Sequence, residues 1–212
     1  MRERPILFSG PMVRALLAGT KTQTRRVVKP QPNSTHSGFP YWNVGGYRAS
    51  WCRSAADGGP LEPANPLLCR YGQRGDRLWV RETFGHFERN ENFKLGCEVF
   101  YRADGNYLEL EPWRPSIHMP RWASRITLDI NAVRIERLHD ISEADAAAEG
   151  VFYSTDHMGH WSGTGDRWWT TAREAFRDLW ISINGQPSWD ANPWVWALKF
   201  DRIQATEKGK KQ

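Results

Sequence analysis

Alternating apolar and polar residues mark several stretches of the chain as β-strands. The longest runs from Ile126 to Leu138, where apolar residues are separated by Thr, Asp, Arg and Glu. We expect one long bent strand here or a hairpin around Asn131. Similar alternation covers residues 78–81 and 194–200, and shorter strand-like runs cover 4–9 and 97–102. Because successive side chains of a strand point to opposite faces, these stretches predict a sheet with a buried face.

Helical periodicity is found in three other stretches. Between residues 169 and 183 one face is apolar, and it consists of Ala172, Phe176, Leu179, Trp180 and Ile183. Residues 142–150 predict a short helix that starts at an N-cap Ser142 and stops at Gly150. Residues 11–19 predict another, which begins with Pro11 and ends at Gly19.

Polar groups are concentrated just after the first predicted helix. Thr20, Thr22 and Thr24 alternate with Lys21, Gln23 and Arg25, and Arg26 follows. This alternation predicts a strand. An amine, hydroxyls and two guanidiniums so close together could meet an anionic or strongly polar ligand.

Two stretches lack periodicity and are read as insertions within a single domain covering residues 1–205. Residues 30–74 are rich in Gly, Pro, Ser and Asn but contain several aromatic residues, and a loop of this length is either functional or mobile. Residues 151–168 form a second polar, glycine-rich insertion. We expect the basic tail, residues 206–212, to be disordered.

The composition is that of a folded basic protein. Of its 212 residues 40% are hydrophobic and 13% aromatic, with 12 Trp, and the net charge is +5 with an isoelectric point near 9.3. Seven basic residues and one acidic residue lie within the first 30 positions. This excess favours a nucleotide or nucleic-acid partner, the alternative being a solvated basic surface.

The sequence contains no pattern typical of a metal site, a bound cofactor or a membrane span. The three cysteines, Cys52, Cys69 and Cys97, are far apart and form no C-x-x-C pair. The histidines of the second insertion, His157 and His160, are read as loop residues. The charged start of the chain does not have the pattern of a secretory signal, and no run approaches the roughly 20 apolar residues of a membrane span. We therefore expect a cytoplasmic protein without metal or cofactor.

Two further groups of residues are candidates for ligand contact. Arg81 and Glu82 end a predicted strand, where they either pair with each other or contact substrate. Residues 113–125 place Trp and Arg on both sides of two prolines and include His118, Arg121 and Trp122. Such a segment suits base stacking with phosphate contact, or it is a covering loop whose indoles fill the edge of the core.

Three motifs carry a resemblance to a known family. Residues 19–26 resemble the G-x-K-T-x-T-x-R signature of ASCH domains, which are small barrels similar to the PUA fold. The Gly75-Asp76 strand and the Ser142–Gly150 helix, similar to (S/T)-E-x-x-A-x-x-E-G, occur in the order of that family. The resemblance covers residues 5–29, 75–150 and 168–202. It implies an α+β, mainly β fold: a small PUA-like β-barrel with flanking short helices and two long insertions.

The resemblance also implies candidate functions. Some small ASCH proteins are amidohydrolases that remove the acetyl group of N4-acetylcytidine, and their catalytic residues resemble Lys21, Thr24 and Glu149. Other members resemble RNA-binding modules or ribonucleases, and larger Trp-rich members occur in phages and prophages. The substrate contacts expected here are Arg25, Arg26, Arg81, Glu82, His118, Arg121 and Trp122. The insertions depart from the small enzymes and could reshape the pocket.

The catalytic interpretation makes a geometric demand. A threonine hydroxyl needs a base to take its proton, and a lysine can serve only if its pKa falls toward neutrality. In a regular strand Lys21 and Thr24 would point to opposite faces, so a bulge or a strand-end twist at Thr22 or Gln23 is required to bring them together. Glu149 would protonate the departing amine or position water, although a helix-end Glu is more often solvated.

Two functions therefore remain open at this point: hydrolysis of an N-acylated pyrimidine nucleoside, and non-catalytic binding of RNA or a modified base. A ribonuclease is a third alternative, and a structural role in phage assembly a fourth. The first predicts that Lys21, Thr24 and Glu149 converge in one pocket.

Overall fold

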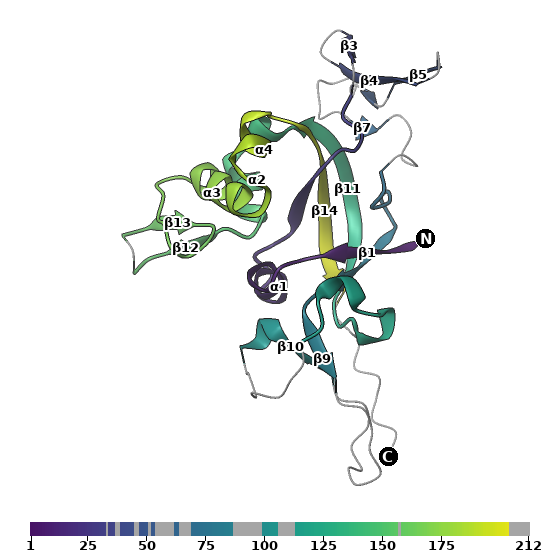
Figure 1. Ribbon diagram of the computed structural model, residues 1–212. Helices are drawn as coiled ribbons and strands as arrows, with labels where there is room; N and C mark the ends of the chain where they lie inside the picture. The colour runs from purple at the N-terminus through teal and green to yellow at the C-terminus, as the bar shows by residue number, and fades with distance from the viewer. Residues whose placement is uncertain are drawn as a thin grey trace.

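A computed structural model describes residues 1–32, 69–86, 99–105, 113–156 and 158–203, together with the backbone of five short strands between residues 34 and 63. The fold is α+β and mainly built of strands, as predicted (Figure 1). Its central sheet consists of β1 (Glu3–Leu7), β2 (Gln23–Val27), β8 (Arg77–Arg81), β11 (Thr127–Arg137) and β14 (Trp194–Ile203). The helices are α1 (Gly10–Leu17), α2 (Glu143–Ala148), α3 (Ala172–Asn184) and α4 (Gln186–Asp190).

The central sheet has the strand order β1-β8-β11-β14-β2. β1 and β8 run parallel, and every other neighbouring pair is antiparallel. β11 is one continuous strand, not a hairpin, with an irregularity in its pairing to β14 between Ile130 and Ala132. Asn131, the predicted position of a possible turn, therefore lies at a bulge, which bends the strand without ending it.

The predicted closed barrel is not found among the described residues. β1 and β2 are the two edges of the sheet, and no backbone ladder joins them. The edges approach each other instead through a side chain, because Nη2 of Arg26 donates to the carbonyl of Leu7 at 2.6 Å. A curved sheet left open at this point leaves space between its edges, and the cavity described below lies there.

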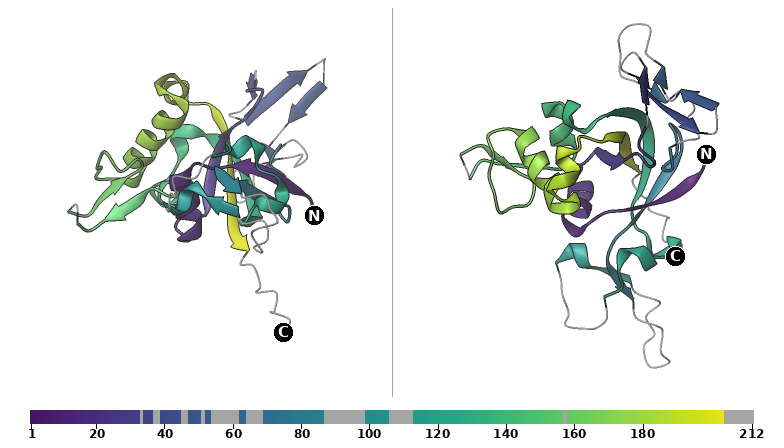
Figure 2. Two further views of the ribbon diagram at one scale, coloured as in Figure 1. Left: turned by 60° about the horizontal axis from the view of Figure 1, so that its bottom comes forward. Right: turned by 45° about the horizontal axis from the view of Figure 1, so that its top comes forward.

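Three helices form a separate layer beside the sheet, with α2, α3 and α4 grouped on one side (Figures 1 and 2). Ser142 caps α2 as predicted, accepting a hydrogen bond from the backbone of Asp145. α3 starts after a capping box formed by Thr171 and Glu174, and its apolar face is buried. Ile183 is an exception to that predicted face, since it is 57% exposed.

The two insertions contain more regular structure than the sequence predicts. The first holds β3 (Ser34–His36), β4 (Phe39–Val44) and β5 (Tyr47–Ser50) in one antiparallel sheet, and β6 (Cys52–Arg53) paired with β7 (Glu62–Pro63). The second forms a hairpin of β12 (Phe152–Ser154) and β13 (His160–Ser162) beyond α3 (Figure 2). The strands of the first insertion were missed because its many Gly, Pro, Ser and Asn residues favour turns and loops. His157 and residues 206–212 lie outside the described residues.

A smaller antiparallel pair, β9 (Phe84–His86) and β10 (Val99–Tyr101), follows β8. The prediction of a strand near residues 97–102 is thereby confirmed over its described part. Residues 113–125 form two single turns of 3₁₀ helix, at Ser116–His118 and Arg121–Ala123. Among the described residues, no helix is long and apolar enough to cross a membrane.

Candidate functional site

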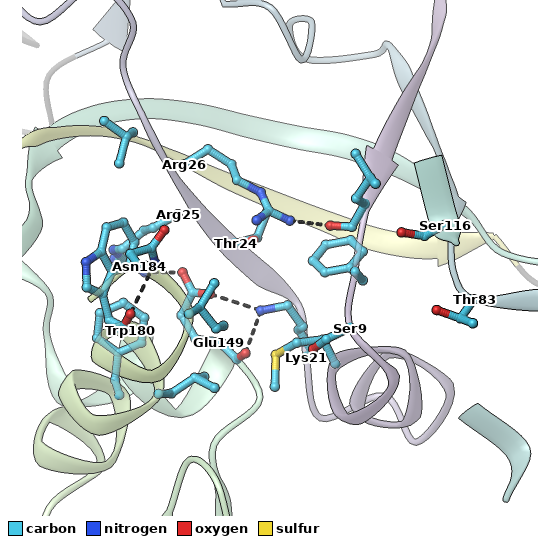
Figure 3. Close-up of a pocket in the computed structure, with 17 residues that line it drawn as sticks. Ser9, Lys21, Thr24, Arg25, Arg26, Thr83, Ser116, Glu149, Trp180 and Asn184 are labelled. Atoms are coloured by element: carbon cyan, nitrogen blue, oxygen red, sulfur yellow. Dashed lines mark hydrogen bonds and ion pairs between the residues drawn. The ribbon is translucent and has the colours of Figure 1, made fainter. Parts of the chain in front are cut away.

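A cavity of about 390 Å³ opens between the edges of the sheet and α3 (Figure 3). Its volume lies at the lower end of the range of about 300–1,000 Å³ typical of small-molecule sites. Four polar lining residues come from the segment around β2, one from the end of α2, and an apolar wall from α3. The lining residues that matter below are Phe8, Lys21, Thr24, Arg25, Arg26, Glu149, Phe176, Trp180 and Asn184.

Lys21 and Thr24 reach the same cavity because the strand begins later than the sequence predicts. β2 starts at Gln23, and Lys21 forms an isolated antiparallel bridge with Glu149. Between them Thr22 donates its N–H to Ala148 and accepts from the N–H of Phe200, both at 2.9 Å. The chain thus changes pairing partner at Thr22, which meets the geometric demand without a bulge inside the strand.

Lys21 and Glu149 form a buried ion pair. Nζ of Lys21 lies 2.9 Å from Oε2 of Glu149 and 2.5 Å from its backbone oxygen. Both residues are at most 4% exposed, so Glu149 is not the solvated helix-end glutamate that is more common. Gly150 follows in a left-handed conformation (φ +91°), and a Cβ there would lie only 3.1 Å from the Cβ of Lys21. A glycine at this helix end therefore allows the lysine to pack closely against it.

Arg25 holds three carboxylates from two elements. Its Nη1 lies 3.0 Å from Oε1 of Glu149, its Nε 2.8 Å from Oε1 of Glu136, and its Nη2 3.2 Å from Oδ2 of Asp145. Asp145 is also bound by Arg134 at 2.8 Å and by the amide of Gln23 at 2.6 Å. This network fixes Glu149 on the side opposite Lys21.

Burial and charge act against each other in this network. Burial is the largest influence on Lys21 and lowers the pKa of its ammonium; Glu149 opposes this, and Arg26 and Arg25 add to the lowering. Burial alone would raise the pKa of Glu149, but Lys21 and Arg25 outweigh it and hold that pKa below its ordinary value. The site therefore contains an ionised carboxylate beside an amine that is easier to deprotonate than a free lysine.

Thr24 and Arg26 keep unused hydrogen-bonding capacity. The Thr24 side chain is almost fully buried, yet its hydroxyl has no hydrogen bond to any residue that the structure describes, Lys21 included. Arg26 donates to Leu7, and its guanidinium lies 5.1 Å from the centre of the Phe8 ring. These two side chains are consequently the groups most available to a ligand.

The other candidate residues lie outside this cavity. Glu82 does not pair with Arg81, because neighbouring residues at the end of a strand point to opposite faces. It binds Arg125 instead through two contacts of 3.0 Å, while Arg81 donates to the carbonyl of Ile117. The structure thus overturns the predicted Arg81–Glu82 pair.

The aromatic and basic segment after β10 also lies elsewhere. Arg121 pairs with Glu3 at 2.9 Å, and Trp122 is 61% exposed with its edge against His86. His118 ends an exposed 3₁₀ turn, although Ser116 of the same turn does line the cavity. His118, Arg121 and Trp122 therefore do not join Lys21, Thr24 and Glu149.

Sequence reasoning missed two kinds of residue. In the sequence, Glu136 is a polar position of a predicted strand and Asp145 an early residue of a predicted helix. Only their closeness in space to Arg25, which lies more than 100 positions away along the chain, gives them a role. Phe176 and Trp180, which form part of the wall, were predicted only as core-facing residues of a helix, and Asn184 lay beyond the end of that predicted helix. The one available signal was the concentration of carboxylates between positions 136 and 149.

Among the described residues, no group of three or more His, Cys, Asp or Glu side chains is placed to share a metal ion. Comparisons of the chain with family models, curated proteins and solved structures find no match.

The carboxylate network predicts that the protein loses stability in acid. Glu149 and Asp145 both have a pKa below the ordinary values of 4.5 and 3.8, so the unfolded chain takes up protons first as the pH falls. Their stabilisation is complete above those values and disappears as the pH falls through the lower, folded-state pKa. Urea unfolding between about pH 7 and pH 3 measures this loss.

A Glu149→Gln variant provides the comparison. We expect it to be less stable than the wild type at neutral pH and to lose less stability on acidification. Asp129→Asn, at a carboxylate that is 46% exposed, serves as the matched control and should follow the wild type. An identical acid dependence in Glu149→Gln and wild type would contradict the prediction.

Proposed function

We propose that this protein is an amidohydrolase that acts on an N-acylated pyrimidine nucleoside such as N4-acetylcytidine, with a PUA-like, ASCH-type fold. The observation that carries the proposal is that Lys21, Thr24 and Glu149 line one cavity although they are up to 128 positions apart. These are the positions that resemble the catalytic residues of the ASCH amidohydrolases. The aromatic side chains of Phe8, Phe176 and Trp180 leave room for a flat ring beside them.

Lys21 is suited to act as the general base. A neutral lysine amine has two N–H groups and one lone pair. Its contacts with Oε2 and the backbone oxygen of Glu149 use two N–H groups, which leaves the lone pair for a third direction. Since Thr24 lines the same cavity with an unpaired hydroxyl, substrate binding has only to bring these two groups into hydrogen-bond distance.

The proposed reaction has two stages. Lys21 takes the proton of the Thr24 hydroxyl while its oxygen bonds to the acyl carbon, and the resulting ammonium returns the proton to the amine as the carbon–nitrogen bond breaks. Water then attacks the threonine ester, again losing a proton to Lys21, and the acid departs as the Thr24 hydroxyl re-forms. The ammonium also stabilises the negative oxygen of each tetrahedral intermediate.

Glu149 has a supporting part in this scheme. Both of its oxygens accept from cations and its pKa is lowered, so it is a poor proton donor at neutral pH. We therefore assign it the orientation of Lys21, and the alternative in which it protonates the leaving amine is disfavoured. Arg25 in turn orients Glu149.

RNA binding is the second candidate, and a different face favours it. The guanidiniums of Arg81 and Arg121 lie 5.4 Å and 5.9 Å from the centre of the Trp79 ring, and the exposed Trp122 follows directly. Cations next to indoles suit a single-stranded nucleic acid. Such binding would weaken steeply with added salt.

Substitution of Thr24 tests the hydrolase proposal. Thr24→Val keeps the shape of the side chain and removes the hydroxyl, so release of acetate from N4-acetylcytidine should fall by at least about 10²-fold. Thr24→Ser retains a nucleophile and should keep part of the activity. Mass spectrometry of the quenched reaction should find an acetyl group on wild-type Thr24. Equal rates for wild type and Thr24→Val would exclude this threonine as the nucleophile.

A further inference from the structure

The charges that line the cavity are not balanced. Lys21, Arg25 and Arg26 contribute positive charge, and Glu149 is the only carboxylate among the lining residues. Lys21 and Arg25 both pair with Glu149, and Arg25 has two further carboxylates behind it. Arg26 has no carboxylate partner among the residues that the structure describes. The uncompensated charge of the cavity therefore resides on Arg26.

Arg26 is also held in place for a ligand. Nη2 donates to the Leu7 carbonyl at 2.6 Å, and the guanidinium lies 5.1 Å from the centre of the Phe8 ring. The ammonium of Lys21 lies 5.5 Å from the centre of the same ring. A guanidinium has five N–H donors, so most of those on Arg26 remain available after the bond to Leu7. Burial is the largest influence on Arg26 and lowers its pKa, while Glu149, which forms no ion pair with Arg26 in the described part of the chain, partly opposes this.

Two other arginines of the protein meet this cost with carboxylates. Arg125, partly buried, is bound by Glu82 and Asp104, and even the more exposed Arg121 pairs with Glu3. A cation in a cavity without such a partner is complementary to an anion supplied from outside, and the planar guanidinium fits phosphate or carboxylate oxygens.

We infer that the ligand of this cavity carries an oxyanion, a phosphate or a carboxylate, which Arg26 binds. The inference rests on the proposed function for the identity of the reacting group, and it narrows the substrate class. The expected substrate is an acylated nucleotide, or another N-acyl compound with an acidic group, and a neutral nucleoside would lack the part that Arg26 recognises.

Equilibrium binding tests this without requiring turnover, with two reaction products and one N-acyl acid as ligands. Calorimetry on the full chain compares cytidine, cytidine 5′-monophosphate and N-acetylglycine, so that its arms separate a phosphate from a carboxylate. We expect one of the two anionic compounds to bind at least about tenfold more tightly than cytidine at low salt. Tighter binding of N-acetylglycine would indicate that the substrate carries a carboxylate. Tighter binding of cytidine 5′-monophosphate would indicate that the substrate is a nucleotide.

Variants of Arg26 identify the cation responsible. Arg26→Gln should remove the preference for the anionic compound while leaving the affinity for cytidine nearly unchanged. Arg26→Lys should keep part of the preference for the anionic compound. It provides a second test if Arg26→Gln does not fold. Arg167→Gln, which removes an arginine whose side chain is 72% exposed, is the matched control and should bind as the wild type.

The outcomes separate this inference from the hydrolase proposal. Equal binding of neutral and anionic compounds, absence of binding by both anions, or a preference that survives in both Arg26 variants would overturn the inference alone. Conversely, an anion preference that depends on Arg26 in a protein that hydrolyses no acyl amide would leave it standing and reject the proposed reaction.

Discussion

Replacing Lys21 by arginine is expected to abolish amide hydrolysis while preserving the fold. An arginine keeps a positive charge beside Glu149 and can still donate to the carboxylate and the backbone oxygen that Lys21 contacts. A guanidinium does not lose its proton in a protein, so it cannot accept the proton of Thr24. The rate of acetate release should therefore fall by about 10³-fold, the usual contribution of a general base.

Two measurements make this prediction sharp. Thermal unfolding of Lys21→Arg should remain close to that of the wild type, because the buried ion pair is retained. Lys199→Arg is the matched control, since this lysine is exposed on β14, the strand that pairs with β2. Substantial hydrolysis by Lys21→Arg would show that the residue contributes charge alone and would require another base.

Most helices and strands of the described part of this fold can be predicted from the sequence. The alternation of β11 and β14, the Ser142 cap of α2 and the amphipathic face of α3 depend on residues close together, and each was found close to where the pattern predicts it. These predictions are reliable because helix capping and the spacing of apolar residues depend only on neighbouring residues. They predict the mixture of strands and helices, whereas the α+β class was expected from the resemblance.

The pairing of elements that are distant in the chain is harder to predict from the sequence. Whether β1 and β2 close a barrel depends on a few hydrogen bonds between strand edges, and here a side-chain contact from Arg26 to Leu7 takes their place. Likewise, the alternation around Lys21 continues without interruption, so nothing local shows that pairing changes at Thr22. Register and closure are decided by the partner strand, which a single stretch of sequence does not contain.

The residues of the candidate site are likewise only partly predictable from the sequence. Its reactive groups, Lys21 and Thr24, were identified from one short motif, and Glu149 through resemblance. Glu136 and Asp145 gave no such sign, because a carboxylate on a strand or in a first helical turn is usually solvated. Their part depends on a buried arginine that lies on another strand.

That arginine carries the largest expected effect on stability. In Arg25→Met the three carboxylates of Glu136, Asp145 and Glu149, each within 3.2 Å of the guanidinium in the wild type, would lose the cation that holds them together. Removing one member of a buried ion pair typically costs about 3–5 kcal/mol of unfolding free energy. Since a domain is stabilised by only about 5–15 kcal/mol in total, this is a large fraction.

Thermal and urea unfolding of Arg25→Met should accordingly show a midpoint lower by roughly 6–20 °C, given about 2–4 °C per kcal/mol for a chain of this size. Arg121→Met removes an arginine whose side chain is 44% exposed and should cost under about 1 kcal/mol, which controls for the loss of a surface ion pair. The double variant Arg25→Met, Glu136→Gln should recover part of the loss, because one of the repelling charges is removed with the cation. If Arg25→Met were no less stable than Arg121→Met, the network would not stabilise the fold, and the low pKa of Glu149 would need another cause.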